Sequence, residues 1–266
     1  LYGLIAGITA NDGGSAIANY APEVSSGLVF GISMVVASFA LGGVISADYC
    51  RFAKSRGDVV KSSIVGVIPA GLFMLMTGAL MSIVTGQYDI SAILASLGVP
   101  FIGLVALVLA TWTTNVTNAY SGGLALSNLL GFDESKFKIT TGVAGGIGTL
   151  LAAFGLLNAF QSFLSLMSAL IPPLAGVLIA SYWIVGNGKK ENFAIRSGFS
   201  AIGVVSFAVG AIFACITGGT FASFPGLVEA LPFLNRPFFV GPVNGIVVSL
   251  VLYVILAKVF PEKKTA

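Results

Sequence analysis

The chain has 266 residues, of which 56% are hydrophobic and 9% are charged, and its mean hydropathy is +1.00. A soluble domain carries about 25% charged residues, so this composition argues against a soluble globular enzyme. The sequence has no histidine, which is the commonest general base. Its two cysteines, Cys50 and Cys215, lie far apart and form no zinc-binding or disulfide pattern. The net charge of +3 is too small to indicate a nucleic-acid partner. We therefore predict an all-α polytopic membrane protein that is not an enzyme and holds no cofactor.

Stretches free of Asp, Glu, Lys and Arg are long enough to cross a membrane, which takes about 20 apolar residues. They cover 24–47, 62–88, 90–132, 139–188, 197–228 and 237–257. The stretch 139–188 is long enough for two spans and divides near 155–158. The stretch 90–132 begins with a short amphipathic piece at 90–97, which is followed by one span. The stretch 197–228 holds one span, which ends at about Ile216. The sequence therefore predicts seven membrane helices, and a stub at Leu1–Thr9 is typical of the end of an eighth.

Lysine and arginine are distributed unevenly between the loops. Twelve of the 13 cations fall on one side of the predicted spans, and only Arg236 falls on the other. The cation-rich side of a membrane protein is normally cytoplasmic. We therefore expect a multi-pass protein of the cell membrane, in which the first span runs from the outside inward and the C-terminus is cytoplasmic.

Two adjacent glycines, Gly42 and Gly43, lie near the middle of the first span. Glycine costs about 1 kcal/mol in a helix interior. A glycine pair in a membrane either unwinds the helix and frees backbone groups for a ligand or allows another helix to approach closely. Composition alone favours close packing.

The third span carries a dense run of Thr, Asn, Trp, Tyr and Ser at 109–121. In a helix, the carbonyl of Ala110 and the hydroxyls of Thr113 and Thr114 lie on neighbouring turns of one face. Oxygens in this arrangement suit a desolvated Na⁺, by analogy with the oxygen ligands that other hard cations prefer.

Asn115 and Asn118 in the same run offer paired donor and acceptor groups, which suit a neutral amide-like ligand. The alternative for the whole run is hydrogen bonding between membrane helices. The density of polar side chains in a span without charge favours a binding site.

The residues Ala110–Ser127 resemble the cytosine permeases of the nucleobase:cation symporter-1 family, as do Ile45–Ala53 and the preceding Ser38-Phe39. The similarity runs along the whole chain. Family members carry Asp-Asn after Thr-Thr-Asn, where this chain has Val116-Thr117. Cytosine, another pyrimidine or purine, hydantoin-like compounds and vitamin precursors therefore all stay open as substrates.

The resemblance implies a fold of twelve membrane helices, in which helices one to five and six to ten are inverted repeats, as in the leucine-transporter fold, and two further helices follow. Residues 1–266 would then be a single transmembrane domain fragment that contains the end of helix five, helices six to ten and the two C-terminal helices. The chain would be the second half of the fold, and its partners would include the missing N-terminal helices of the same protein and the lipid bilayer.

The resemblance also implies a function, that of a secondary active cation symporter for a nucleobase such as cytosine, incomplete as given. Ser38 would lie at the substrate site on helix six, and Phe39 would stack on a planar heterocycle. Ala110, Thr113 and Thr114 would form part of a sodium site on helix eight, and the neighbouring Asn115 would bind the base. Helices one and three would complete these sites, and H⁺ is the alternative coupling ion.

Two other functions fit the sequence less well. An amino-acid permease, or another small-solute permease of the same fold, would bind charged groups, whereas Phe39 and Asn115 suit a neutral planar ligand. A channel or a non-transporting membrane subunit is the second alternative. Channels repeat their filter residues by symmetry, and no such repeat is evident in this sequence.

Overall fold

The computed structural model describes residues 2–10, 12–22, 27–155, 159–189, 192 and 199–260. Within these ranges every regular element is a helix, which confirms the predicted all-α polytopic class. The chain divides into two compact units, one made of Leu1–Ser25 and Asp48–Leu151 and the other of Ser26–Ala47 and Ala152–Ala266. That residues 1–266 act as one transmembrane domain stays a prediction.

All seven predicted spans have a helical counterpart in the described residues. Four helical segments of 19 to 31 residues are apolar enough to cross a membrane, namely Arg56–Thr85, Pro100–Leu130, Phe160–Val185 and Gly241–Val259. Three further apolar helices have 17 residues each, which is at the short end of the range for a crossing helix; they are α3 (Leu28–Val44), α9 (Phe137–Ala153) and α12 (Ala201–Thr217). The division expected near 155–158 falls between α9 and the next helix, and residues 156–158 lie outside the described residues.

Two of the long segments change helix type along their length. The first consists of α5 (Arg56–Lys61), the π-helix η1 (Ser62–Val67) and α6 (Ile68–Thr85). The second consists of α10 (Phe160–Leu170), α11 (Pro172–Ile179) and the π-helix η4 (Ala180–Val185). The helix is interrupted at Ile171, directly before Pro172, because proline cannot donate a backbone hydrogen bond inside a helix.

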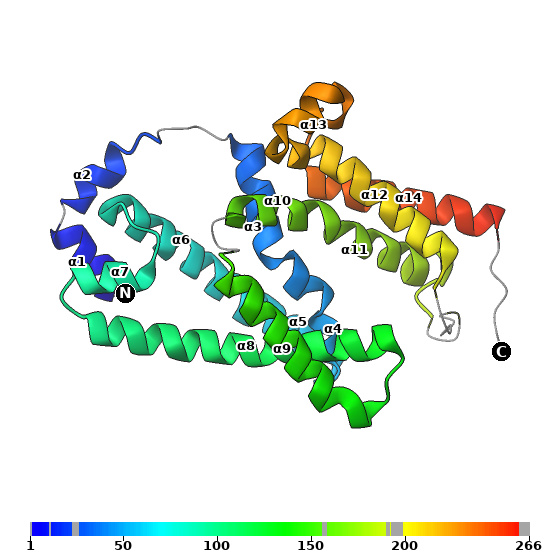
Figure 1. Cartoon of the computed structure of the whole chain (residues 1–266), viewed down its shortest axis with the longest axis horizontal. Helices are drawn as coiled ribbons and strands as arrows, with labels where there is room; N and C mark the ends of the chain where they lie inside the picture. Colours follow the sequence, from blue (N-terminus) through cyan, green and yellow to red (C-terminus); the bar gives the residue numbers. More distant parts are fainter. Residues whose placement is uncertain are drawn as a thin grey trace. The chain divides into compact units, whose positions relative to one another are not determined.

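In the first unit, short helices pack against long ones where glycine leaves room. The helices α1 (Tyr2–Ala10) and α2 (Gly13–Ala18) lie against α6, and a β-carbon added to Gly3 would come within 2.7 Å of Cε of Met81. The expected amphipathic piece is α7 (Ile90–Ser96), which lies beside the start of α8 (Pro100–Leu130) in Figure 1. A β-carbon on Gly103 of α8 would lie 2.9 Å from Cβ of Leu94 on α7.

The C-terminal half of α8 lies against α9. A β-carbon on Gly123 would be 2.8 Å from Cα of Thr141, so only a glycine fits at this approach. The hydroxyls of Ser127 and Thr140 are 2.8 Å apart and form a buried hydrogen bond between the two helices. Small and hydroxylated residues therefore join these helices, as is common in membranes.

In the second unit, α11, α12 and α14 (Gly241–Val259) pack side by side, as Figure 1 shows. Small residues spaced by four line the contact between α12 and α14, and we call them the small-residue seam: Gly210 and Ala214 on α12, Gly218 directly after α12, and Gly241, Gly245 and Ser249 on α14. A β-carbon on Gly245 would lie 2.8 Å from Cγ of Pro173 and 2.9 Å from Cβ of Ala214. The hydroxyl of Ser249 donates to the carbonyl of Pro173 at 2.8 Å, which ties α14 to α11.

Three short helices connect α12 to α14: η6 (Thr220–Ser223), α13 (Pro225–Ala230) and η7 (Pro232–Leu234). Gly219 precedes η6 with a φ of +74°, in the left-handed region that favours glycine. The buried hydroxyl of Thr220 donates to the carbonyl of Ser165 at 3.2 Å and lies 3.3 Å from the hydroxyl of Ser165. These bonds attach η6 to α10.

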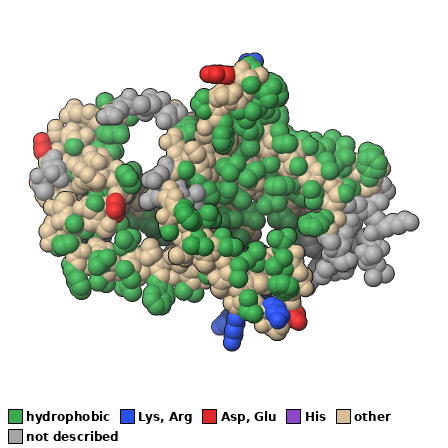
Figure 2. Space-filling view, viewed as in Figure 1, with side chains coloured by type: hydrophobic (Ala, Val, Ile, Leu, Met, Phe, Trp, Pro, Cys, Tyr) green, Lys and Arg blue, Asp and Glu red, His purple; other side chains and the backbone are tan. Residues whose placement is uncertain are grey.

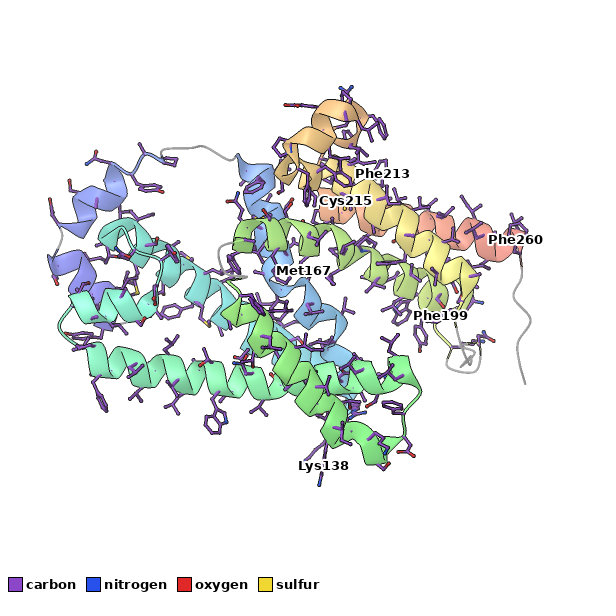
Figure 3. The ribbon with its side chains drawn as sticks, in the orientation of Figure 1. Lys138, Met167, Phe199, Phe213, Cys215 and Phe260 are labelled. Atoms are coloured by element: carbon purple, nitrogen blue, oxygen red, sulfur yellow. The ribbon has the colours of Figure 1, made fainter. Side chains whose placement is uncertain are left out.

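The surface has the character expected of a membrane protein. Figure 2 shows hydrophobic side chains over α12 and α14. Phe213 on α12 and Phe260, directly after α14, are labelled in Figure 3 and are 39% and 62% exposed. Lys138 projects from the beginning of α9 in Figure 3. Large exposed apolar areas are rare on soluble monomers and typical of surfaces that meet lipid or protein.

Two loop carboxylates begin helical segments. Asp89 accepts hydrogen bonds from the hydroxyl and the backbone N–H of Ser91, and Asp133 does the same with Ser135 at the beginning of η2 (Glu134–Lys136). The hydrogen bond from the serine hydroxyl has the largest effect, followed by the bond from the serine N–H. Together they hold the pKa of both carboxyls below its ordinary value because they stabilise the ionised form.

Candidate functional site

The polar run predicted to bind sodium lies in the middle of α8, on an uninterrupted helix. The hydroxyl of Thr113 donates to the carbonyl of Ala110 at 3.0 Å, so two of the three predicted sodium ligands are in contact. Thr114 follows on the next step of the helix. The structure therefore brings two of the three oxygens together, and whether the three bind sodium stays a prediction.

Other threonines in the run bond in the same way. The hydroxyl of Thr111 donates to the carbonyl of Leu107 at 2.7 Å, and that of Thr117 donates to the carbonyl of Thr114 at 2.7 Å. A hydroxyl that donates its proton to a carbonyl one turn earlier keeps its lone pairs free to accept. These threonines can therefore sit on an apolar helix and still present oxygen atoms to a cation.

Within the first unit, no other element buries this part of α8. Ala110, Thr113, Thr114, Asn115 and Asn118 are all exposed among the described residues. Polar groups at membrane depth are tolerated where they line a cavity or contact protein, and they are costly against lipid. The polar face of α8 is therefore available to a ligand or to another protein segment.

A cluster of aromatic and hydroxyl groups adjoins the polar run. The hydroxyl of Tyr49, on α4 (Ser46–Cys50), lies 2.9 Å from the hydroxyl of Ser121 and 3.3 Å from the carbonyl of Thr117, to which it donates. The guanidinium of Arg51 hydrogen-bonds the hydroxyl of Tyr120 and lies over its ring, 5.8 Å from the centroid. This cluster holds α4 on α8, one to two turns beyond the predicted sodium ligands. Tyr49 and Arg51 fall within the stretch Ile45–Ala53 that resembles a known family.

The substrate residues predicted on the first span lie on α3. The helix continues through Gly42 and Gly43, and the interruption comes at Ile45, after which α4 begins. The hydroxyl of Ser38 donates to the carbonyl of Val35 at 2.8 Å. Gly42 and Gly43 therefore keep helical geometry in this structure, and the break in the helix follows two residues after the pair.

Phe39 is 60% exposed, and its ring lies 3.5 Å from the position of a β-carbon on Gly42. That distance is an ordinary van der Waals contact, and a β-carbon on Gly43 would meet no atom within 4 Å in the described residues, so no close contact among these residues requires a glycine at either position. An exposed aromatic ring in this setting can stack on a flat ligand.

The predicted substrate residues belong to different units. Ser38 and Phe39 lie in the unit that contains α10 to α14, and Asn115 and Asn118 lie in the unit that contains α8. Their joint contact with one ligand stays a prediction. No group of three His, Cys, Asp or Glu side chains that could hold a metal occurs in the described part of the chain, so a cation site there would depend on neutral oxygens.

Comparison with known proteins identifies relatives along nearly the whole chain. A family model described as "permease for cytosine/purines, uracil, thiamine, allantoin" matches residues 3–241. The cytosine permease of Escherichia coli strain K12 is 30% identical over 237 residues, which cover 88% of this chain and 51% of that protein. The allantoin permease of Bacillus subtilis is 24% identical over 245 residues, which cover 82% of this chain and 47% of that protein. The hydantoin permease of Microbacterium maritypicum is 24% identical over 151 residues, which cover 53% of this chain and 30% of that protein.

The chain thus spans about half the length of the cytosine and allantoin permeases that it matches. These relatives are named as permeases and not as enzymes. The comparison therefore agrees with the expectation that the chain is not an enzyme.

Proposed function

This chain belongs to the family of permeases for cytosine/purines, uracil, thiamine and allantoin, and from that premise we propose that it is part of a secondary active symporter for a neutral nucleobase such as cytosine. The observation that carries the proposal is the run of uncharged polar side chains on α8, exposed in the middle of a helix long enough to span the membrane. Neutral donors and acceptors suit a neutral heterocycle better than they suit a charged solute.

The coupling ion in this proposal is Na⁺, bound by the carbonyl of Ala110 and the hydroxyls of Thr113 and Thr114. These three residues are exposed in the described structure and carry no competing charged group, which supports this choice. Proton coupling would use a titratable group within the membrane. The α8 segment from Pro100 to Leu130 contains none with a carboxyl or imidazole side chain, which favours Na⁺ over H⁺ for this half of the site.

The substrate in this proposal stacks on Phe39 and hydrogen-bonds Asn115, with Ser38 and Asn118 nearby. The exposure of the Phe39 ring and of both asparagines within their own units supports these roles. The family description and the names of the relatives favour a nucleobase or a related ring, such as allantoin or a hydantoin, over an amino acid.

We further propose that the transporting protein contains helices in addition to these 266 residues, arranged as the first of two inverted repeats. The support is that the permeases it matches are about twice as long. The additional helices would complete the sodium site and cover the exposed polar face of α8. The protein would lie in the cell membrane with its C-terminus in the cytoplasm, because twelve of its 13 cations fall on one side of the spans.

Uptake measurements test these proposals together. Cells that express the native, full-length protein should accumulate radiolabelled cytosine or another nucleobase when a sodium gradient is present, and the rate should fall when choline replaces sodium. Cells that express only residues 1–266 should not accumulate it. Uptake of amino acids but not of any nucleobase would support the amino-acid permease instead, and sodium-dependent uptake by residues 1–266 alone would contradict the need for further helices.

A further inference from the structure

The second unit contains a polar cavity that none of the predicted sites uses. It lies between α3, α10 and η6 and has a volume of about 410 Å³. This is within the range of about 300–1,000 Å³ typical of small-molecule sites. The residues that shape it are Phe30 from α3, Gln161, Ser162 and Ser165 from α10, and Gly219 and Ser223 beside and within η6.

The cavity has fixed walls. Ser33 and Ala37, three and seven residues beyond Phe30 on the same face of α3, are 3% and 5% exposed, so α3 is well packed on this side below the cavity. The hydrogen bonds between Ser165 and Thr220 hold η6 against α10. The opening is therefore a consequence of how three packed elements meet.

The lining indicates a neutral, flat, polar ligand. No charged side chain is among the residues that line the cavity in the described structure. The amide of Gln161 provides both donors and an acceptor, the hydroxyl of Ser162 can do either, and the ring of Phe30 provides an aromatic surface.

We propose that this cavity is an outer binding site for a neutral planar heterocycle, at which the solute binds before it reaches the central site. The proposal rests on the proposed nucleobase transport. The distribution of cations places the beginnings of α3 and α10 on the outer side of the membrane. Phe30 precedes Ser38 by eight residues, or about 12 Å along a helix, so the outer site is separate from the central one.

Protection from thiol labelling tests the proposal in cells that express the native, full-length protein. The variant Ser162→Cys should react with a membrane-impermeant maleimide added outside. At a cytosine concentration about ten times the Kd of the outer site, the reaction should slow about tenfold, because the unoccupied fraction is then about one tenth. The matched control is Gly226→Cys on α13, an open position that does not line the cavity, and its labelling rate should not change.

The same labelling in a second variant distinguishes binding at the outer site from binding at the central site. Protection of Ser162→Cys should persist when Asn115→Leu removes the proposed central contact with the base. Loss of protection in that background would show that the effect arises from central binding, and it would overturn the outer site. Labelling that cytosine never slows, or that occurs only in permeabilised cells, would also overturn it.

The experiments distinguish a failure of the proposed function from a failure of the outer site. If the native protein neither binds nor takes up any nucleobase, nucleobase transport is refuted, and the outer site is refuted with it. If the native protein transports a nucleobase and Ser162→Cys is labelled without protection, only the outer site is refuted. Gln161→Leu, at an exposed position, provides an independent variant: it should raise the cytosine concentration that gives half-maximal protection, whereas Gln87→Leu, a glutamine exposed in a loop, should not.

Discussion

Removing the hydroxyl of Tyr49 tests whether the short helix α4 holds α8 in the arrangement that we propose binds a cation. In Tyr49→Phe the ring remains, whereas the contacts with the carbonyl of Thr117, at 3.3 Å, and with the hydroxyl of Ser121, at 2.9 Å, are lost. Thr117 is itself bonded to the carbonyl of Thr114, one of the predicted sodium ligands. We therefore expect the variant to bind sodium more weakly.

The size of the effect follows from the two hydrogen bonds. Bonds between membrane helices average about 0.6 kcal/mol, so the loss of both is about 1.2 kcal/mol. If all of this free energy appears in cation binding, the sodium concentration for half-maximal uptake rises at most about sevenfold, because 1.4 kcal/mol corresponds to a factor of ten. A smaller rise would mean that part of the loss appears as reduced stability of the whole unit.

The assay is the sodium dependence of nucleobase uptake by the native, full-length protein. Tyr88→Phe is the matched control, since Tyr88 lies in a loop and is 88% exposed. The reasoning is refuted if Tyr49→Phe reaches the membrane in normal amounts and its sodium dependence is the same as that of the control. A change in the maximal rate alone, without a change in sodium dependence, would also contradict it.

Three other predictions concern packing, cation binding and pH. Gly245→Ala should destabilise the protein by about 1–3 kcal/mol in thermal unfolding, because its β-carbon would lie within 3 Å of two neighbours, whereas Gly226→Ala, in open space, should change little. Thr113→Val should raise the sodium concentration for half-maximal uptake more than tenfold, since a hydrogen-bonding group on a charge contributes about 1.5–3 kcal/mol, and Thr113→Ser should restore it. Ser135→Ala should destabilise the protein at neutral pH, and the difference should vanish as the pH falls below the lowered pKa of Asp133, because the bonds stabilise only the ionised carboxyl. A difference that grows toward acid pH would contradict that assignment.

The helical class and the approximate positions of the long helices could be predicted from the sequence, because the signal is local. Charged residues are excluded from a membrane span, so the stretch without charges identifies each span directly. The boundaries differ where a helix extends beyond the apolar stretch. The second span was expected over 62–88, whereas its helix begins at Arg56, capped by the side chain of Ser55, which accepts from the backbone N–H of Asp58. The polar turn from Arg56 to Lys61 is helical without being apolar, and the search for apolar stretches therefore omitted it.

Contacts between helices could not be predicted in the same way. Gly210 and Gly245 each belong to a four-residue repeat of small residues that is visible in the sequence. The repeat does not show that these two glycines face each other across two helices. The same holds for Tyr49 and Ser121, which are 72 residues apart. These contacts depend on the path of the chain in space, and a small-residue pattern fits several partners equally well.

The hydroxyls of α8 explain how a span without charge can present a surface suited to a cation. In Thr111, Thr113 and Thr117 the hydroxyl proton is donated to a carbonyl of the preceding turn, at 2.7, 3.0 and 2.7 Å. The atoms left for a ligand on these side chains are therefore lone pairs, which attract a hard cation and cannot donate to an anion. Asn115 and Asn118 are the side chains of the run that still offer amide N–H donors together with an acceptor. The run thus separates into oxygens that suit an ion and amides that suit a neutral base, without placing a formal charge in the membrane.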